Sequence, residues 1–144
     1  MLPSELSYLA GFIDGEGSFI ICKRLHTNEF GTWKGYSLFI DIGNTNLEVL
    51  QWIKNKTGNT SEIYINPQKG NRKQMYRMRI NAKLSKKLAE ELLPYLIVKR
   101  EQADVFLKFP FDKKRLNSVL KEQLFQEMKK LNFRGIGLTS KPLL

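Results

Sequence analysis

The chain has 144 residues, a length that favours a single domain with its own hydrophobic core. Hydrophobic residues make up 42% and charged residues 26%, an ordinary composition for a soluble protein, and 24 Lys and Arg against 14 Asp and Glu give a net charge of +10. With a pI of about 9.8, this balance indicates a nucleic-acid ligand. One cysteine and one histidine exclude an internal disulfide and a Cys/His zinc site, and leave little for a Ser-His-Asp triad.

No apolar run approaches the roughly 18–20 residues that a membrane span requires. The N-terminus also lacks the basic start and apolar core of a secretory signal. We therefore expect a soluble protein that stays where it is made, which includes an organelle with its own genome. We expect residues 1–144 to form one domain, with 136–144 as a loosely ordered tail.

Hydrophobic periodicity divides the chain into alternating helices and strands. Ser4 and Asn81 are expected as helix N-caps because their side chains can accept a backbone N–H. The expected elements in chain order are a helix from Pro3 to about Gly15, strands over 18–25 and 36–43 around a polar loop at 26–35, a helix from a cap at 44–46 to Gly58, strands over 61–66 and 73–80 around a turn at 67–71, a helix from Asn81 to Pro94, a helix over 95–108, and a last helix from near Asp112 to Leu131. The order αββαββα, followed by two helices, predicts an α+β domain with hairpins covered by helices on one face.

The fourth strand lies in the most basic part of the sequence. Eight Lys or Arg and no acidic residue occur from Lys69 to Lys87. A charged face that only resists edge aggregation is one interpretation. Double-stranded DNA is the favoured ligand, because a two-stranded ribbon fits its major groove. RNA is disfavoured because its major groove is deep and narrow. The period of two and the neighbouring strands give these candidate DNA-binding residues: Arg24, Ser37, Tyr64, Asn66, Lys73, Arg77 and Arg79.

The stretch from Leu9 to Gly17, LAGFIDGEG, combines small residues with two acids. Gly11 and Gly15 lie four apart on one helix face, where small residues let two helices approach closely. Glu16 follows at the helix end between two glycines, so its carboxylate and nearby carbonyls form a hard-oxygen set suited to Mg²⁺. A glycine-capped helix end with an exposed acid is the simpler interpretation.

These nine residues resemble the LAGLIDADG motif of homing endonucleases almost position for position, with Phe12, Gly15 and Glu16 at the exchanged positions. The element order and residues 94–103 are also similar to single-motif members. The resemblance implies a fold with a concave antiparallel DNA-binding sheet and C-terminal helices. It further implies that Glu16 and the Gly15 carbonyl bind a divalent metal, Mg²⁺, while the catalytic residues are Glu16, Lys99 and Asn44.

A single motif in the chain implies a homodimer that supplies a second Glu16. The interface residues expected from the motif are Ala10, Gly11, Asp14 and Gly15. The implied activity is Mg²⁺-dependent hydrolysis of both strands of double-stranded DNA at a long, nearly palindromic site, which promotes homing of the host intron. The compartment would be a chloroplast or mitochondrion, or the cytoplasm of a prokaryote or a phage-infected cell. The alternatives are an RNA maturase that assists splicing of its host intron and a DNA-binding regulator.

Overall fold

The computed structural model describes residues 1–111 and 117–133. The α+β class and the αββαββα order are confirmed. The elements are α1 (Pro3–Glu16), β1 (Gly17–Asn28), β2 (Gly31–Asn44), α2 (Leu47–Thr57), β3 (Ile63–Asn66), β4 (Met75–Ile80), α3 (Ala82–Leu92), the 3-10 turn η1 (Leu93–Tyr95), α4 (Arg100–Lys108) and α5 (Ser118–Leu131). The expected start of the last helix near Asp112 and the expected tail at 136–144 lie outside the described residues. Within the described ranges, every helix is too short or too polar to cross a bilayer.

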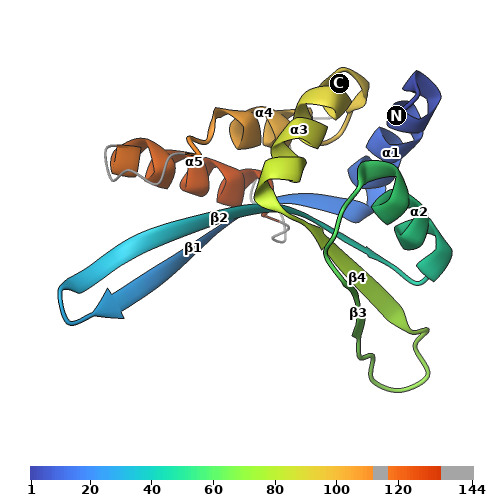
Figure 1. Ribbon diagram of the computed structural model, residues 1–144, viewed down its shortest axis with the longest axis horizontal. Helices are drawn as coiled ribbons and strands as arrows, with labels where there is room; N and C mark the ends of the chain where they lie inside the picture. The colour runs from blue at the N-terminus through green and yellow to red at the C-terminus, as the bar shows by residue number, and fades with distance from the viewer. Residues whose placement is uncertain (112–116, 134–144) are drawn as a thin grey trace, which may run out of the picture.

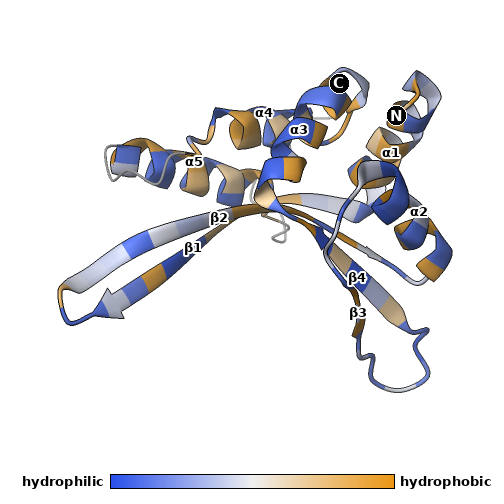
Figure 2. Cartoon of the chain, in the orientation of Figure 1, coloured by the Kyte–Doolittle hydropathy of each residue, from blue (hydrophilic) through white to orange (hydrophobic). Residues whose placement is uncertain are grey.

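The four strands form one antiparallel sheet in the order β1-β2-β4-β3, and the described helices lie on one side of it (Figure 1). The β1–β2 and β3–β4 hairpins diverge below the helices as two arms of an arch. Apolar residues are concentrated where the helices meet the centre of the sheet, whereas much of the distal β1–β2 arm is hydrophilic (Figure 2). The largest fully buried side chains are Phe19, Phe106, Leu9, Ile13, Ile40, Ile42, Leu50, Ile53, Met78, Ile80, Leu92 and Leu96.

One face of the sheet packs against the described helices. The opposite face, which those helices leave uncovered, is called the open face below. Phe19 and Ile40 are buried against the helices, so residues of the opposite parity in each strand point to the open face. The pairing of Asp41 with Arg79 and of Tyr64 with Arg77 extends this assignment to β3 and β4. The principal open-face residues are Ser18, Ile20, Cys22, Arg24, His26, Trp33, Ser37, Phe39, Asp41, Tyr64, Asn66, Met75, Arg77 and Arg79.

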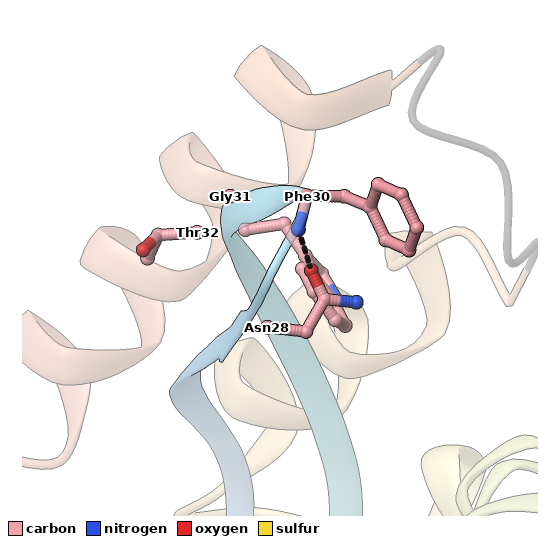
Figure 3. A pocket seen from close by; sticks show the side chains of 5 residues that line it. Asn28, Phe30, Gly31 and Thr32 are labelled. Atoms are coloured by element: carbon pink, nitrogen blue, oxygen red, sulfur yellow. Dashed lines mark hydrogen bonds between the residues drawn. The ribbon is translucent and has the colours of Figure 1, made fainter.

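The β1–β2 hairpin is longer than the sequence pattern predicted. The expected loop at 26–35 is wrong, because pairing continues to Asn28 opposite Gly31. The Phe30 N–H donates to Asn28 Oδ1 at 2.9 Å in the tight turn (Figure 3), and Gly31 has a φ of +129°, which favours glycine. Polar composition suggested a loop, but an arm that projects beyond the core exposes both faces and needs no apolar alternation.

The capping predictions had different outcomes. Asn46 and Asn81 are confirmed as N-caps, since their Oδ1 atoms each accept a backbone N–H at 3.1 Å. Ser4 is wrong as the first cap. The N-cap of α1 is Leu2, whose N–H donates to Glu5 Oε2 at 2.9 Å, with Pro3 as the first helical residue.

A polar cluster joins α5 to the helix side of the β1–β2 arm. Lys23 Nζ donates to Glu122 Oε1 at 2.9 Å, and the Tyr36 hydroxyl donates to Glu122 Oε2. The hydrogen bond from Tyr36 is the main reason that the pKa of Glu122 falls to about 2. Burial and the same hydrogen bond raise the pKa of Tyr36 to about 12. The cluster thus links the arm to a helix distant in sequence.

This cluster predicts a loss of folding stability in acid. The folded pKa of Glu122, about 2, lies below its ordinary value of 4.5, so the unfolded chain binds a proton first as the pH falls. The contribution is therefore present above pH 4.5 and declines toward pH 2. We expect Glu122→Gln to flatten this part of a plot of Tm against pH, measured by circular dichroism, and Tyr36→Phe to flatten it partly. An unchanged acid slope in Glu122→Gln would contradict the assignment.

Candidate active site and nucleic-acid interface

The motif helix α1 runs directly into β1, with Glu16 as the last helical residue and Gly17 as the first strand residue. A Cβ at Gly17 would lie 3.0 Å from Ile13 Cα, so glycine permits this close exit from the helix. Gly17 pairs with Ile42, and one further step of the ladder places Glu16 across from Gly43. Glu16 is exposed and, by strand alternation from β1, lies at the edge of the open face.

Lys99 is brought to the same helix end from the segment before α4. Its Nζ is buried and donates to the carbonyls of Ile13, at 3.1 Å, and Asp14. The Asp14 carboxylate in turn accepts the backbone N–H groups of Ile97 at 2.8 Å, Val98 at 3.2 Å and Lys99 at 2.9 Å. A lysine ammonium at the negative end of the helix dipole is a favourable arrangement. The structure therefore places Lys99 within one helical turn of Glu16.

The end of α1 offers part of a divalent metal site. The Gly15 carbonyl lies in the last helical turn, where carbonyls have no helical donor four residues on, and Glu16 adds a carboxylate. Lys99 already donates to the Ile13 and Asp14 carbonyls, so the donors left for a hard cation are the Gly15 carbonyl and the Glu16 carboxylate. Within residues 1–111 and 117–133, no group of three His, Cys, Asp or Glu is placed to hold a metal. The donors fit Mg²⁺ chemically, but as an incomplete set.

Asn44 lies at the end of β2, opposite Tyr76. Its parity with Ile42 places it on the helix side of the sheet, and its Oδ1 accepts the Asn46 N–H at 2.8 Å in the turn that leads into α2. Of the three expected catalytic residues, Glu16 and Lys99 therefore lie at the same end of α1. The Asn44 side-chain oxygen instead accepts a hydrogen bond within its own turn. Its role in positioning water stays a prediction.

Six of the seven expected DNA-binding residues share the open face. Lys73 does not share their strand, because β4 begins at Met75 and the period of two does not extend to the loop before it. The six that lie on the strands of the open face are Arg24, Ser37, Tyr64, Asn66, Arg77 and Arg79. They come from both arms of the arch, so the open face offers polar and cationic groups along its whole length.

The basic strand has an acidic neighbour that the sequence argument missed. Asp41 of β2 is buried at 7% exposure and accepts a hydrogen bond from the Arg77 guanidinium, while its Oδ1 lies 3.8 Å from Arg79 Nε. The acid-free run around β4 suggested an entirely cationic face. The alternation of β2 assigned Asp41 to the same side as Ser37, but only the β2–β4 pairing brings it to the arginines.

The expected interface residues differ in their exposure. Gly11 and Gly15 are exposed, and a Cβ at either would meet no atom of the chain's described part within 4 Å. Ala10 is wrong as an interface residue, because its side chain is fully buried in the chain's own core. Asp14 is half-buried, with its carboxylate engaged as described above. Near it, Ile97 is 85% exposed although its backbone N–H donates to the Asp14 carboxylate.

Solved structures with the same fold include several endonucleases. An archaeal intron-encoded homing endonuclease complexed with DNA, I-Vdi141I, gives a TM-score of 0.71 at 23% identity, covering 95% of this chain and 89% of that chain. I-CvuI in complex with the I-CreI target gives 0.65 at 23% identity, covering 94% and 86%. The meganuclease I-CpaMI bound to uncleaved DNA gives 0.56 at 20% identity, covering 96% of this chain but 54% of that one.

The sequence itself carries a family signature. No curated protein matches the chain significantly. The family model described as LAGLIDADG endonuclease matches residues 9–109, from the first residue of the motif to the end of α4. This match spans well over half of the chain and includes the second half of α1, the whole sheet and the segment that carries Lys99. The chain therefore belongs to the LAGLIDADG endonuclease family.

Proposed function

We propose that the chain acts as a homodimer that cuts both strands of double-stranded DNA at a long, nearly palindromic site in a reaction that requires Mg²⁺, and so promotes homing of its host intron. The observation that carries this proposal is the position of Glu16. It is an exposed carboxylate at the edge of the open face, one turn from Lys99 and on the same helix as the exposed Gly11 and Gly15.

The homodimer follows from the incomplete metal site. Two copies related by a two-fold axis would pack their α1 helices through Gly11 and Gly15, since small residues permit the close end of the roughly 8–10 Å range of helix separations. Such packing sets two Glu16 carboxylates side by side. The chain spans about half of I-CpaMI and 89% of I-Vdi141I, which supports one copy of the unit here.

The proposed chemistry rests on three side chains and one backbone carbonyl. Glu16 and the Gly15 carbonyl would hold Mg²⁺, and a bound divalent ion lowers the pKa of water and neutralises the leaving oxygen. Lys99 fixes the end of α1 and places a cation beside the reacting phosphate. Asn44 would order solvent. I-CvuI has been solved with DNA in the presence of Mg, where the DNA was not cleaved, and of Ca, which supports a divalent ion as the cofactor.

The open face would lie along the major groove. The groove is about 12 Å wide and admits a two-stranded ribbon, so each arm can follow it on either side of Glu16. Arg77, Arg79 and Tyr64 would act from the β3–β4 arm, and Arg24 and Ser37 from the β1–β2 arm. The complexes of I-Vdi141I and I-CpaMI with DNA support a duplex as the ligand.

The direct test uses a plasmid that carries the fused exons flanking the host intron. We expect the purified protein to convert it to one discrete linear product with Mg²⁺ and to bind without cutting in EDTA. A plasmid with the intron inserted, which interrupts the site, is the matched control. Binding to the intron RNA without cleavage of the fused exons would contradict the proposal and favour a maturase.

Arginine substitutions test the binding surface. Arg77→Ala or Arg79→Ala should weaken DNA binding by about 1–3 kcal/mol and relax the preference at one position of each half-site if the side chain contacts a base. If it contacts a phosphate, the slope of log affinity against log salt should decrease by about one unit. Lys129→Ala, at an exposed position on α5, is the control. Unchanged affinity and salt dependence in both arginine variants would show that β4 faces away from the duplex.

A further inference from the structure

A single acidic side chain lies in the middle of the basic open face. Asp41 is 7% exposed, whereas the side chains of Arg77 and Arg79 are 41% and 52% exposed. The Asp41 carboxylate accepts a hydrogen bond from Arg77 through Oδ2 and lies 3.8 Å from Arg79 Nε through Oδ1. One buried acid therefore contacts two cations that project from the sheet.

The neighbouring residues define the direction of both arginines. Gly43, which is opposite Arg77, has no side chain, and a Cβ there would lie 3.6 Å from Arg77 Cγ. The Arg77 side chain therefore lies across Gly43 toward Asp41. The guanidinium carbon of Arg79 lies 4.6 Å from the centroid of the Phe39 ring, a cation–π contact that adds to the carboxylate. Arg77 is therefore held by a hydrogen bond to Asp41, and Arg79 by a longer ion pair with Asp41 and by its contact with the Phe39 ring.

Stability alone does not account for this cluster. Asp41 Oδ1 and Arg77 Nε are buried and have no hydrogen-bond partner within the described part of the chain. Burial of polar atoms without partners is unfavourable, and half-exposed ion pairs contribute little to folding. The arrangement instead keeps two cations in set directions on a surface that the proposed function assigns to DNA.

We propose that Asp41 is a specificity-determining positioning residue, which directs Arg77 and Arg79 to guanine edges in the major groove and away from phosphates. The inference rests on the proposed function of the open face. A guanidinium with one edge held in place presents its remaining N–H donors in a set direction, and two such donors match guanine O6 and N7. The nearby carboxylate repels phosphate, so non-specific binding, which depends on free cations, is kept low.

The test compares Asp41→Asn with a matched loss of charge. Glu127→Gln removes one negative charge from an exposed residue of α5, on the helix side of the sheet. Each protein selects from a pool of duplexes with a randomised centre in EDTA, and its affinity for an unrelated duplex is measured against salt. We expect Asp41→Asn to lose about tenfold of its preference for guanine at two positions of each half-site. We also expect its salt slope on the unrelated duplex to steepen by about one unit, with Glu127→Gln unchanged in both respects.

Asp41→Glu separates positioning from charge, because it keeps the carboxylate but moves it by one methylene. We expect this variant to retain the shallow salt slope while its preferred bases change at the same positions. Wild-type base preference in both Asp41 variants would overturn the proposal, as would an equal steepening of the slope in Glu127→Gln. If Asp41→Asn does not fold, Asp41→Glu decides by its base preference. Failure of the wild-type protein to enrich any duplex would instead refute the proposed function.

Discussion

Replacement of Glu16 by glutamine is expected to abolish DNA cleavage while binding to the same duplex stays largely intact. The amide keeps the size of the side chain but loses the negative charge that a divalent ion requires. Metal stabilisation of the transition state supplies several kcal/mol, so we expect the rate of strand cleavage to fall by about a thousandfold or more. Glu16 is exposed at the end of α1, so the change should leave the Tm near that of the wild type.

The cleavage rate is measured on the fused-exon plasmid at saturating Mg²⁺, and binding is measured on the same site in EDTA. Glu127→Gln, at an exposed position on α5, removes the same charge away from the open face and should cut at the wild-type rate. Cleavage by Glu16→Gln at a rate close to that of Glu127→Gln would show that Glu16 is not a metal ligand.

Replacement of Gly11 by leucine should prevent dimer formation and with it the cleavage of both strands. A Cβ at Gly11 meets no described atom of its own chain within 4 Å, so the monomer can accept the larger side chain without repacking. In a dimer, however, two leucines would meet at the axis between the α1 helices, where close approach requires small residues. Separated helices would also move the two Glu16 carboxylates away from the phosphates that they serve.

Sedimentation with and without DNA measures this effect directly. The wild-type protein should have twice the 16.8 kDa mass of one chain, at least when bound to its site, whereas the Gly11→Leu variant should remain at the monomer mass. Gln123→Leu introduces the same side chain at an exposed position on α5 and should leave the dimer unchanged. A wild-type monomer that cuts both strands, or a fully active Gly11→Leu dimer, would show that α1 is an ordinary core helix.

Local signals in the sequence were reliable at two of the three predicted helix caps, Ser4 being the exception. The Asn46 and Asn81 caps and the left-handed Gly58 at the end of α2 lie where the sequence predicts them, because a cap involves only residues a few positions away. The polar stretch at 26–35 misled the prediction for the opposite reason. In that stretch the two strands pair with each other beyond the core. Neither face is buried there, so the sequence shows no alternation of apolar and polar residues.

By itself, the sequence determined the αββαββα order, the motif helix that ends at Glu16 and the basic face of β4, since each depends on periodicity or spacing within one segment. The tertiary structure decided three further points. The rotation of α1 buries Ala10 and exposes Gly11, and the path before α4 brings Lys99 to the end of that helix. The pairing of β2 with β4 places Asp41 between the arginines. These contacts join segments distant in sequence, so they follow from strand register and helix packing, which no local pattern specifies.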